Sequence, residues 1–441
     1  MHSVVVGLGK TGASCLRYLA KRGMPVRATD SRRVPPGLEE LGALRRSLDL
    51  RLGGFDLSLL DGASQVLMSP GVPLEEPIAR VARDRGIEVL GDVELFARNV
   101  QAPVIGITGT NGKSTVTSLV ARMAAAAGRS VLAGGNLGTP ALDLLEQPVP
   151  DLYVLELSSF QLETTWTLKL LAAVVLNVTA DHMDRYATVS DYARAKSRIF
   201  AHADTVVLNA DDPRVSAMRG GPGAVVTFSV ERPDADFSLL RAGAAMHLAR
   251  RGKALLDVSR LKIAGRHNAA NALAALALGE AAGLPMPAML WALETFAGLP
   301  HRSEWIADVA GVRFVDDSKG TNVGATIAAV AGMPGPLVMI AGGLGKGQDF
   351  TPLAQAFRGK VRHAILIGKD APALAAALEG VCPTAIAASM QEAVSAAARV
   401  AAPGDTVLLS PACASFDMFR DYGHRGDAFA AAVRGLDRGP R

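Results

Sequence analysis

The chain has 441 residues, of which 49% are hydrophobic and 20% are charged. A chain of this length is too long for a single hydrophobic core and is expected to fold as about three domains. Its 46 basic and 42 acidic side chains leave a net charge of +4. Because these charges are spread along the chain without long basic runs, the composition argues against a nucleic-acid-binding protein and favours one that handles small anionic molecules.

The cysteines and the N-terminus indicate the cell compartment. Cys15, Cys382 and Cys413 contain no C-x-x-C pair, so neither a zinc site nor a disulfide framework is expected. The chain begins with a strand-like run instead of a basic leader, and its longest apolar run, residues 170–176, is too short to span a membrane. We therefore expect a cytoplasmic protein without membrane or nucleic-acid partners.

The first 98 residues alternate β-rich and helical runs, beginning with a strand at 4–6, a helix at 15–21 and a second strand at 25–30. This alternation predicts a parallel, doubly wound sheet. The stretch GLGKTG, residues 7–12, is a G-x-G-x-x-G motif, and Asp30 ends the following strand at the spacing of a ribose-binding acid. The motif by itself predicts a nucleotide site and does not identify the nucleotide.

A second glycine-rich stretch, GITGTNGKST at residues 106–115, has the features of a phosphate-binding loop. It follows a short apolar strand and opens a helix that runs towards Ala127. Backbone N–H groups at such a loop can face a polyphosphate, Lys113 can reach its terminal phosphates, and the Ser114 hydroxyl can bind Mg²⁺. Ile107 stands where the strict motif has glycine, so only the second half of that motif is matched.

Polar residues follow several later strands. Glu156 ends the run LYVLE, Asp181 and His182 follow AAVVLNV, and Lys196 lies in a predicted helix. At the carboxyl ends of parallel strands, such residues can complete a magnesium site opposite the phosphate loop. Each of them alone has an ordinary structural explanation, as a capping acid, a loop histidine or a surface lysine.

Taken together, these motifs resemble the Mur ligase family, ATP-dependent amide ligases of bacterial cell-wall synthesis. In that family G-T-N-G-K-[ST] is the usual form of the phosphate loop. The resemblance covers essentially the whole chain and rests on motifs in one order: GLGKTG with TDSR, SPGV, GTNGKST, GGNLG, ELSSFQLE, DHMDRY, AKSRIF, GRHNAANALAA, GLPHRSEW, DDSKGTN and LSPACASFDMFRDYGHRGDAF.

The resemblance implies an α/β fold with three domains: a Rossmann-like UDP-binding domain at 1–98, a central P-loop ATPase-like domain with a mostly parallel sheet at 99–299, and a C-terminal, Rossmann-like, amino-acid-binding domain at 300–441. It implies a monomer that adds D-glutamate to UDP-N-acetylmuramoyl-L-alanine through an acyl phosphate, for peptidoglycan precursor synthesis. The implied cofactors are ATP and Mg²⁺ at two sites. A Mg²⁺ site would repel the Lys196 ammonium, so a carbamylated Lys196, which offers oxygen ligands, is also expected.

The family motifs also imply residue roles. Catalysis is assigned to Lys113, Glu156, His182 and Lys196, and metal binding to Ser114, Glu156, His182 and Lys196. ATP binding is assigned to Gly109, Thr110, Asn111, Gly112, Lys113, Ser114, Thr115, Asn268, Asn271, Arg302, Asp317 and Lys319. The UDP substrate is assigned to Gly9, Lys10, Thr11, Asp30, Ser31, Arg32, Ser69, Gly71, Asn136, Ser158 and His182. D-Glutamate is assigned to Thr321, Lys346, Ser415 and Tyr422, with Ser415 expected where a helix begins.

The sequence departs from the family pattern at two positions. Gly320 stands where alanine is expected, and Tyr422 stands where phenylalanine is usual beside the glutamate. Three alternatives stay open at this stage. The first alternative is a ligase for another amino acid or for folate polyglutamates. The second is a dehydrogenase that uses GLGKTG for NAD(P), and the third is a non-enzymatic ATP-dependent switch.

Overall fold

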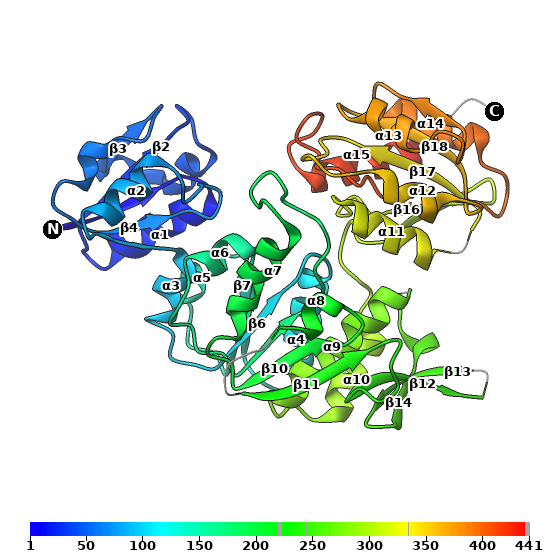
Figure 1. Cartoon of the computed structure of the whole chain (residues 1–441), viewed down its shortest axis with the longest axis horizontal. Helices are drawn as coiled ribbons and strands as arrows, with labels where there is room; N and C mark the ends of the chain where they lie inside the picture. Colours follow the sequence, from blue (N-terminus) through cyan, green and yellow to red (C-terminus); the bar gives the residue numbers. More distant parts are fainter. Residues whose placement is uncertain (137, 219–222, 244, 264, 334, 437–441) are drawn as a thin grey trace.

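The computed structural model describes residues 1–136, 138–218, 223–243, 245–263, 265–333 and 335–436. These residues form three α/β units, each built on its own sheet, in chain order from blue to red in Figure 1. The predicted fold class is therefore confirmed. The last five residues of the third predicted domain, 437–441, lie outside the described residues.

The first unit is a parallel five-stranded sheet in the order β3-β2-β1-β4-β5. Its elements are β1 (His2–Val6), α1 (Lys10–Lys21), β2 (Val26–Asp30), β3 (Asp49–Leu52), β4 (Ala63–Met68), α2 (Pro77–Asp84), β5 (Glu88–Leu90) and α3 (Asp92–Ala97). Helix α1 begins five residues before the predicted Cys15, because the glycine loop leads directly into it. Strand β2 ends at Asp30, as predicted.

The central unit has a nine-stranded sheet in the order β14-β13-β12-β11-β10-β9-β6-β8-β7. Its strands are β6 (Val104–Thr108), β7 (Val131–Gly135), β8 (Leu152–Glu156), β9 (Ala172–Val175), β10 (Thr205–Asn209), β11 (Ala224–Ser229), β12 (Phe237–Ala242), β13 (Ala245–Arg250) and β14 (Lys253–Asp257). Its helices are α4 (Lys113–Ala126), α5 (Ala141–Leu144), α6 (Ser159–Glu163), α7 (Val189–Ser197), α8 (Pro213–Ser216), α9 (Arg266–Ala281) and α10 (Met286–Thr295). Pairing is parallel except in the β12-β13-β14 extension.

The third unit has a six-stranded sheet in the order β15-β16-β20-β17-β18-β19, in which only β15 is antiparallel to its neighbour among the described strands. Its strands are β15 (Glu304–Val309), β16 (Val312–Asp316), β17 (Leu337–Gly342), β18 (Val361–Ile367), β19 (Thr384–Ile386) and β20 (Thr406–Leu409). Its helices are α11 (Val323–Gly332), α12 (Thr351–Phe357), α13 (Ala371–Ala377), α14 (Met390–Val400) and α15 (Tyr422–Leu436).

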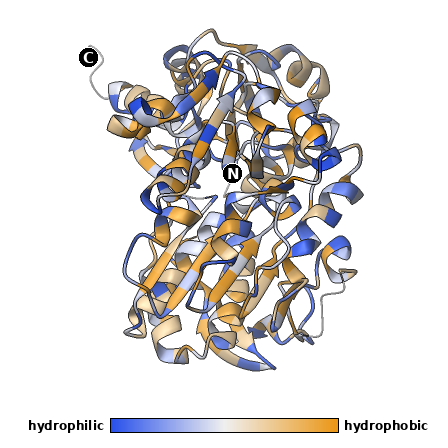
Figure 2. Cartoon of the chain, turned by 90° about the vertical axis from the view of Figure 1, so that its left-hand side faces the viewer, coloured by the Kyte–Doolittle hydropathy of each residue, from blue (hydrophilic) through white to orange (hydrophobic). Residues whose placement is uncertain are grey.

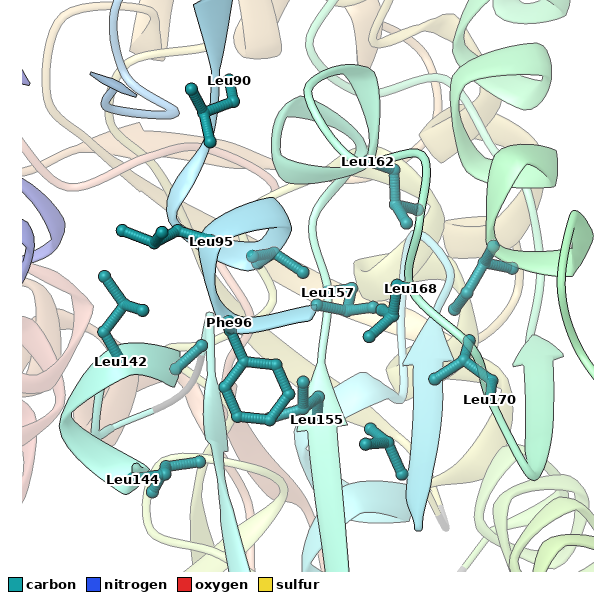
Figure 3. Packing of buried hydrophobic residues seen from close by; sticks show 14 of the residues in the cluster. Leu90, Leu95, Phe96, Leu142, Leu144, Leu155, Leu157, Leu162, Leu168 and Leu170 are labelled. Carbon is teal, nitrogen blue, oxygen red and sulfur yellow. The ribbon is translucent and has the colours of Figure 1, made fainter. Parts of the chain in front are cut away.

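Hydrophobic residues concentrate along the strands and on the helix faces that cover them, as Figure 2 shows. One buried cluster continues from the first unit into the central unit, and its side chains interdigitate around α3 and α5 (Figure 3). Leu95 and Phe96 of α3 pack there against central-unit side chains such as Leu142 and Leu155. Burial of this shared apolar surface joins the two units. Among the described residues, none of the helices is long and apolar enough to cross a membrane.

The first turn of α1 depends on Gly12. A Cβ at this position would lie 1.9 Å from the Gly7 carbonyl oxygen. At Gly9, by contrast, an added Cβ would meet nothing within 4 Å, and the backbone φ of −83° suits any residue.

We therefore expect Gly12→Ala to destabilise the first unit by about 1–3 kcal/mol through overpacking, and Gly9→Ala to stay within about 0.5 kcal/mol of the parent protein. Differential scanning calorimetry of the full chain, read at the transition of the first unit, measures both changes. Equal transition temperatures for the two variants would contradict the close approach of α1 to Gly7.

Candidate functional site

The predicted phosphate loop lies between β6 and α4 of the central unit, at the carboxyl edge of the parallel sheet. Gly109 and Gly112 have φ values of 148° and 88°, which favour glycine. The Lys113 ammonium donates hydrogen bonds to the carbonyls of Gly109, at 2.8 Å, and Thr110, at 2.9 Å. Asn177, which follows β9, fixes the other side of the loop by accepting hydrogen bonds from the backbone N–H groups of Thr110 and Asn111. The loop is therefore fixed from both sides at the N-terminus of α4, where backbone N–H groups can face an anion.

Lys196 of α7 points back to the same loop. Its side chain is 1% exposed, its amine donates to the Gly109 carbonyl at 3.0 Å, and it lies 4.4 Å from the centre of the Tyr192 ring. Burial, and secondarily the charge of Lys113, holds the pKa of Lys196 well below its ordinary value. A shift in this direction makes the neutral amine more accessible.

Glu156 ends β8 beside the loop and is 3% exposed. Its Oε1 accepts a hydrogen bond from the Asn136 amide at 2.7 Å, whereas its Oε2 is buried without a partner in the described part of the chain. Burial alone would raise the pKa of Glu156, but the charge of Lys113 and the Asn136 hydrogen bond lower it overall. A buried, ionised oxygen with no partner is an available ligand for a hard cation.

His182 follows β9 in a left-handed conformation, with φ of 57°. Its ring packs edge-on against Phe160, with the centroids 5.0 Å apart, and burial lowers the pKa of His182 below its ordinary value. The neighbouring Asp181 is 6% exposed. Burial alone would raise the pKa of Asp181, but Lys346 of the third unit lowers it overall. The neutral imidazole can act as a metal ligand or a hydrogen-bond acceptor.

Three side-chain pairs connect the central and third units across this site. The Lys346 ammonium lies 3.1 Å from Asp181 Oδ1, and the Asn322 amide donates to Asp181 Oδ2 at 3.2 Å. Asn322 and Asn111 also exchange amide hydrogen bonds of 3.2 and 3.3 Å. The phosphate loop is thus in direct contact with the N-cap of α11 in the third unit.

Arg302 links the start of the third segment to the phosphate loop by donating a hydrogen bond to the Ser114 hydroxyl at 2.6 Å. Asp317 and Lys319 lie close by. Burial raises the pKa of Asp317 to about 7, and burial together with the charge of Arg302 lowers the pKa of Lys319 to about 8. The three predicted ATP residues of the third segment therefore converge on the loop from one side.

A cavity of about 760 Å³ extends from the phosphate loop to α9 and the third unit. Its wall includes Asn268 and Asn271 of α9, and the Asn271 amide donates to Asn268 at 3.2 Å. The predicted ATP residues that line it are Asn111, Gly112, Thr115, Asn268, Asn271, Arg302, Asp317 and Lys319. Its size and its phosphate-loop wall suit a nucleoside triphosphate.

A second cavity of about 510 Å³ opens over the glycine loop of the first unit and reaches the central unit. The predicted substrate residues on its wall are Gly9, Lys10, Thr11, Asp30, Ser31, Arg32, Ser69, Gly71 and Asn136. The Asp30 carboxylate accepts hydrogen bonds from the Leu8 N–H at 2.6 Å and from Arg32, so part of its acceptor capacity is used internally. At its far end the cavity meets Asn136, which binds Glu156.

The residues predicted to bind D-glutamate make contacts with different partners and do not form a single cluster. Lys346 pairs with Asp181, Thr321 follows Lys319 in a tight turn, and the Lys319 ammonium lies 3.8 Å from the centre of the Tyr422 ring. The expected helix start at Ser415 is wrong. Residues 410–421 form turns and bends, and α15 begins at Tyr422, so the terminal dipole of α15 does not act at Ser415.

Sequence reasoning missed Arg425 of α15, whose side chain is 0% exposed. Its guanidinium donates to the carbonyls of Ser318 and Cys413 and to the Ser318 hydroxyl, at 2.8–3.0 Å. Burial lowers the pKa of Arg425 to about 10. Arg425 thereby ties the DDSKGTN turn to the loop that contains Ser415. An arginine amid small residues in HRGDAF was the only sequence signal for this role.

Backbone strain also marks the site. Non-glycine residues with positive φ occur here at His182, His301, Ser303, Lys346 and Ala412. Such conformations cost on the order of 1 kcal/mol each and persist where the surroundings impose them.

One group of three metal-ligating side chains is found among the described residues, and it is not the predicted one. It consists of His301, Glu304 and Asp316. The His301 ring bonds Asp316 at 2.7 Å, and the His301 N–H donates to Glu304 at 2.8 Å. These atoms satisfy one another, so the group serves as a structural cluster behind Arg302.

Comparison with known proteins agrees with this geometry. The family model for the Mur ligase MurD-like N-terminal domain matches residues 1–91, that for the Mur ligase middle domain matches 107–279, and that for the Mur ligase glutamate ligase domain matches 301–413. The chain belongs to the Mur ligase family.

Individual relatives are more specific. A protein of Nitrosococcus oceani named UDP-N-acetylmuramoylalanine--D-glutamate ligase is 56% identical over 435 residues, which are 98% of this chain and 96% of that protein. A Marinobacter nauticus protein of the same name is 49% identical over 439 residues, 99% and 98% of the two chains. Among solved structures, UDP-N-acetylmuramate-alanine ligase MurC of Thermotoga maritima has a TM-score of 0.64 at 19% identity and covers 99% of this chain and all of its own, a likeness of fold.

We expect Asp181→Asn to weaken closure between the central and third units, because the asparagine keeps an acceptor for Asn322 but loses the ion pair with Lys346. Loss of a charged hydrogen bond of about 1.5–3 kcal/mol would shift the ratio of closed to open molecules at least about tenfold. Small-angle X-ray scattering of the ligand-free protein should show a larger radius of gyration. Asp184→Asn, which changes an exposed neighbour, is the matched control. An unchanged radius in both variants would contradict a closing role for the pair.

Proposed function

We propose that this protein is an ATP-dependent amide ligase that joins D-glutamate to UDP-N-acetylmuramoyl-L-alanine in peptidoglycan precursor synthesis. The observation that carries the proposal is that the substrate-side cavity ends next to a carboxylate at the phosphate loop. The cavity over the first-unit glycine loop ends at Asn136, and the Asn136 amide binds Glu156 beside the phosphate loop. The relatives at 49–56% identity carry the corresponding name over nearly their full lengths.

Each domain binds a different ligand: residues 1–98 bind the UDP substrate, 99–299 bind ATP, and 300–441 bind the amino acid. GLGKTG in this proposal serves a UDP-sugar rather than NAD(P). Because the reaction consumes ATP, we expect it to run in the cytoplasm, and we keep the expectation of a monomer that the family resemblance implies.

The first chemical step activates a carboxylate. An oxygen of the L-alanyl carboxylate attacks the γ-phosphorus of ATP, the bond to the bridging oxygen breaks, and ADP leaves with that electron pair. Lys113 and Arg302 lie at the loop where the transferring phosphoryl group would be bound. Their role is to position the phosphoryl group and neutralise its charge, which is most of the catalysis in phosphoryl transfer.

The residues around Glu156 fit a magnesium site. The partnerless Glu156 Oε2, the Ser114 hydroxyl and the neutral His182 ring are donors of the kind that would hold Mg²⁺ in two sites, together with a carbamate on Lys196. When bound, Mg²⁺ would supply charge neutralisation at the phosphate oxygens.

In the second step the D-glutamate amine attacks the acyl carbon, a C–N bond forms, phosphate leaves, and the amine loses a proton. We assign D-glutamate to Thr321, Lys346, Ser415 and Tyr422 of the third unit. Lys346 is now paired with Asp181, so an incoming carboxylate would compete with Asp181 for the ammonium. Closure of the third unit would also keep the acyl phosphate from water.

The proposal is tested by ADP release with UDP-N-acetylmuramoyl-L-alanine and a panel of D- and L-amino acids. We expect turnover with D-glutamate and at least about 10²-fold less in Lys113→Ala, since that lysine supplies charge at the γ-phosphate. Comparable turnover with a neutral D-amino acid would exclude the D-glutamate assignment. ADP release that does not depend on any amino acid would favour an ATP-dependent switch.

Lys196 is proposed to act as a carbamate. Its neutral amine attacks the carbon of CO₂, an N–C bond forms, and one proton is released to solvent. The depressed pKa of Lys196, caused chiefly by burial, supports the unprotonated amine that this step requires. The competing interpretation is a plain lysine that donates to the Gly109 carbonyl.

We expect Lys196→Arg to abolish ligation, because a guanidinium cannot form the carbamate, and wild-type activity to fall in decarbonated buffer. ¹³C NMR with labelled bicarbonate should show a carbamate signal that disappears in Lys196→Met and persists in Lys169→Met, which changes an exposed lysine. Full activity of Lys196→Arg, or the absence of the signal in the active wild-type enzyme, would overturn the carbamate.

A further inference from the structure

Helix α3 carries two buried carboxylates that the reaction above does not use. Asp92 is 1% exposed and Glu94 is 0% exposed, although α3 only connects the first unit to the central one. Burying a carboxylate is costly unless specific partners compensate for the lost hydration. Apart from Arg98, the side-chain and backbone partners of these carboxylates lie in residues 161–167, within and just after α6.

Glu94 is fully engaged with the end of this segment. Its carboxylate accepts hydrogen bonds from the N–H groups of Trp166, at 2.8 Å, and Thr167, at 3.0 Å, from the Thr167 hydroxyl at 2.7 Å, and from Arg98 at 3.0 Å. Burial alone would raise the pKa of Glu94, but these hydrogen bonds lower it overall. Glu94 therefore anchors the chain that leaves α6.

Asp92 faces the beginning of α6 instead. Its Oδ2 accepts a hydrogen bond from the Gln161 Nε2 at 3.4 Å, and its Oδ1 is buried without a partner among the described residues. Next to it, Gly91 donates its N–H to the Thr164 carbonyl, and a Cβ at Gly91 would lie 2.2 Å from the Thr164 hydroxyl. The segments 91–94 and 161–167 are therefore in close contact along their length.

Gln161 connects Asp92 to the substrate side of α6. Its Oε1 accepts hydrogen bonds from the Ser158 N–H at 3.0 Å and the Ser158 hydroxyl at 3.2 Å, which completes a capping box at the start of α6. Gln161 also lines the first-unit cavity. Ser158 lies two residues after Glu156, so a shift of this cap would move the wall of the cavity and the end of β8 together.

The amide of Gln161 has two nearly equal-shaped ends, and its neighbours decide which end faces which side. A reversed amide would turn its oxygen towards the Asp92 carboxylate and its NH₂ group towards the Ser158 N–H. An acceptor would then face an acceptor on one side, and a donor would face a donor on the other. The Ser158 cap alone leaves a carboxylate acceptable at position 161, because S-x-x-E is an equally good capping box. Only Asp92 requires a donor there.

We infer that Asp92 is a positioning residue for the UDP substrate, which acts by holding Gln161 and the Ser158 cap of α6 in the orientation that forms the substrate cavity. The inference rests on the proposed function for the identity of the substrate. Asp92 itself does not line the cavity and acts on it through Gln161.

The test uses a charge-exchange series in the full-length protein. Gln161→Glu keeps the capping box but places a second carboxylate against Asp92, so we expect the KM for UDP-N-acetylmuramoyl-L-alanine to rise at least about tenfold, a change typical of an unpaired buried polar group. The KM values for ATP and D-glutamate should change less than about twofold. Asp92→Leu, which removes the acceptor, should show the same selective rise.

The double variant Asp92→Asn/Gln161→Glu should recover most of the lost affinity, because the new amide can donate to the new carboxylate. Asp92→Asn alone keeps an acceptor for Gln161, so the KM for UDP-N-acetylmuramoyl-L-alanine should change little. Gln147→Glu, which adds the same charge at an exposed position of the central unit, is the matched control. No recovery in the double variant, or an equal rise of all three KM values, would overturn the inference.

Failure of the proposed function has a different signature, since the wild-type enzyme would then not release ADP with D-glutamate. In that case the coupling of Asp92 to Gln161 is measured on four proteins: the wild type, Asp92→Asn, Gln161→Glu and the double variant. The two measurements are urea unfolding and calorimetric titration with UDP. A coupling in UDP binding supports the positioning role. Additive effects of the two substitutions on both quantities contradict it.

Discussion

Buried positive charge around the phosphate loop is the constraint on which the rest of this molecule depends. Burial lowers the pKa values of Lys113, Lys196, Arg302 and Lys319, and neighbouring cations lower those of Lys113, Lys196 and Lys319 further. Only a few carboxylates, chiefly Glu156 and Asp181, act on these groups in the opposite direction. Because burial disfavours charges of this kind, a polyphosphate that pairs with them would be strongly attracted to the site.

Hydrophobic packing away from the site offsets the unfavourable free energy of these buried charges. Each unit has its own apolar layer on both faces of a largely parallel sheet, and one cluster also joins the first unit to the central unit. Strained backbone, a partnerless carboxylate oxygen at Glu156 and a left-handed histidine are tolerated because these layers over-determine the positions of the strand ends.

The two junctions of the molecule differ in chemistry, and the difference suits the reaction. The first and central units share buried apolar surface and the α3 hydrogen bonds, which favour a fixed relation between the UDP site and Glu156. The central and third units meet at the site through polar pairs such as Asp181 with Lys346 and Asn111 with Asn322. Polar pairs exchange readily with water and with charged ligands, so this second junction is the one that can open for substrates.

The sequence by itself determined the local features of the site and the class of fold. Glycine spacing identified both nucleotide loops, strand-ending polar residues identified Glu156 and His182, and alternation of β and helical runs predicted parallel sheets, because these patterns follow from backbone geometry over a few residues. Tertiary structure alone decided which distant groups meet. The Asp181–Lys346 pair and the Asp92–Gln161 contact depend on how separate sheets pack, and no periodicity along the chain encodes a contact between side chains 69 to 165 positions apart. The burial of Arg425 likewise depends on a partner far along the chain, Ser318, within the third unit.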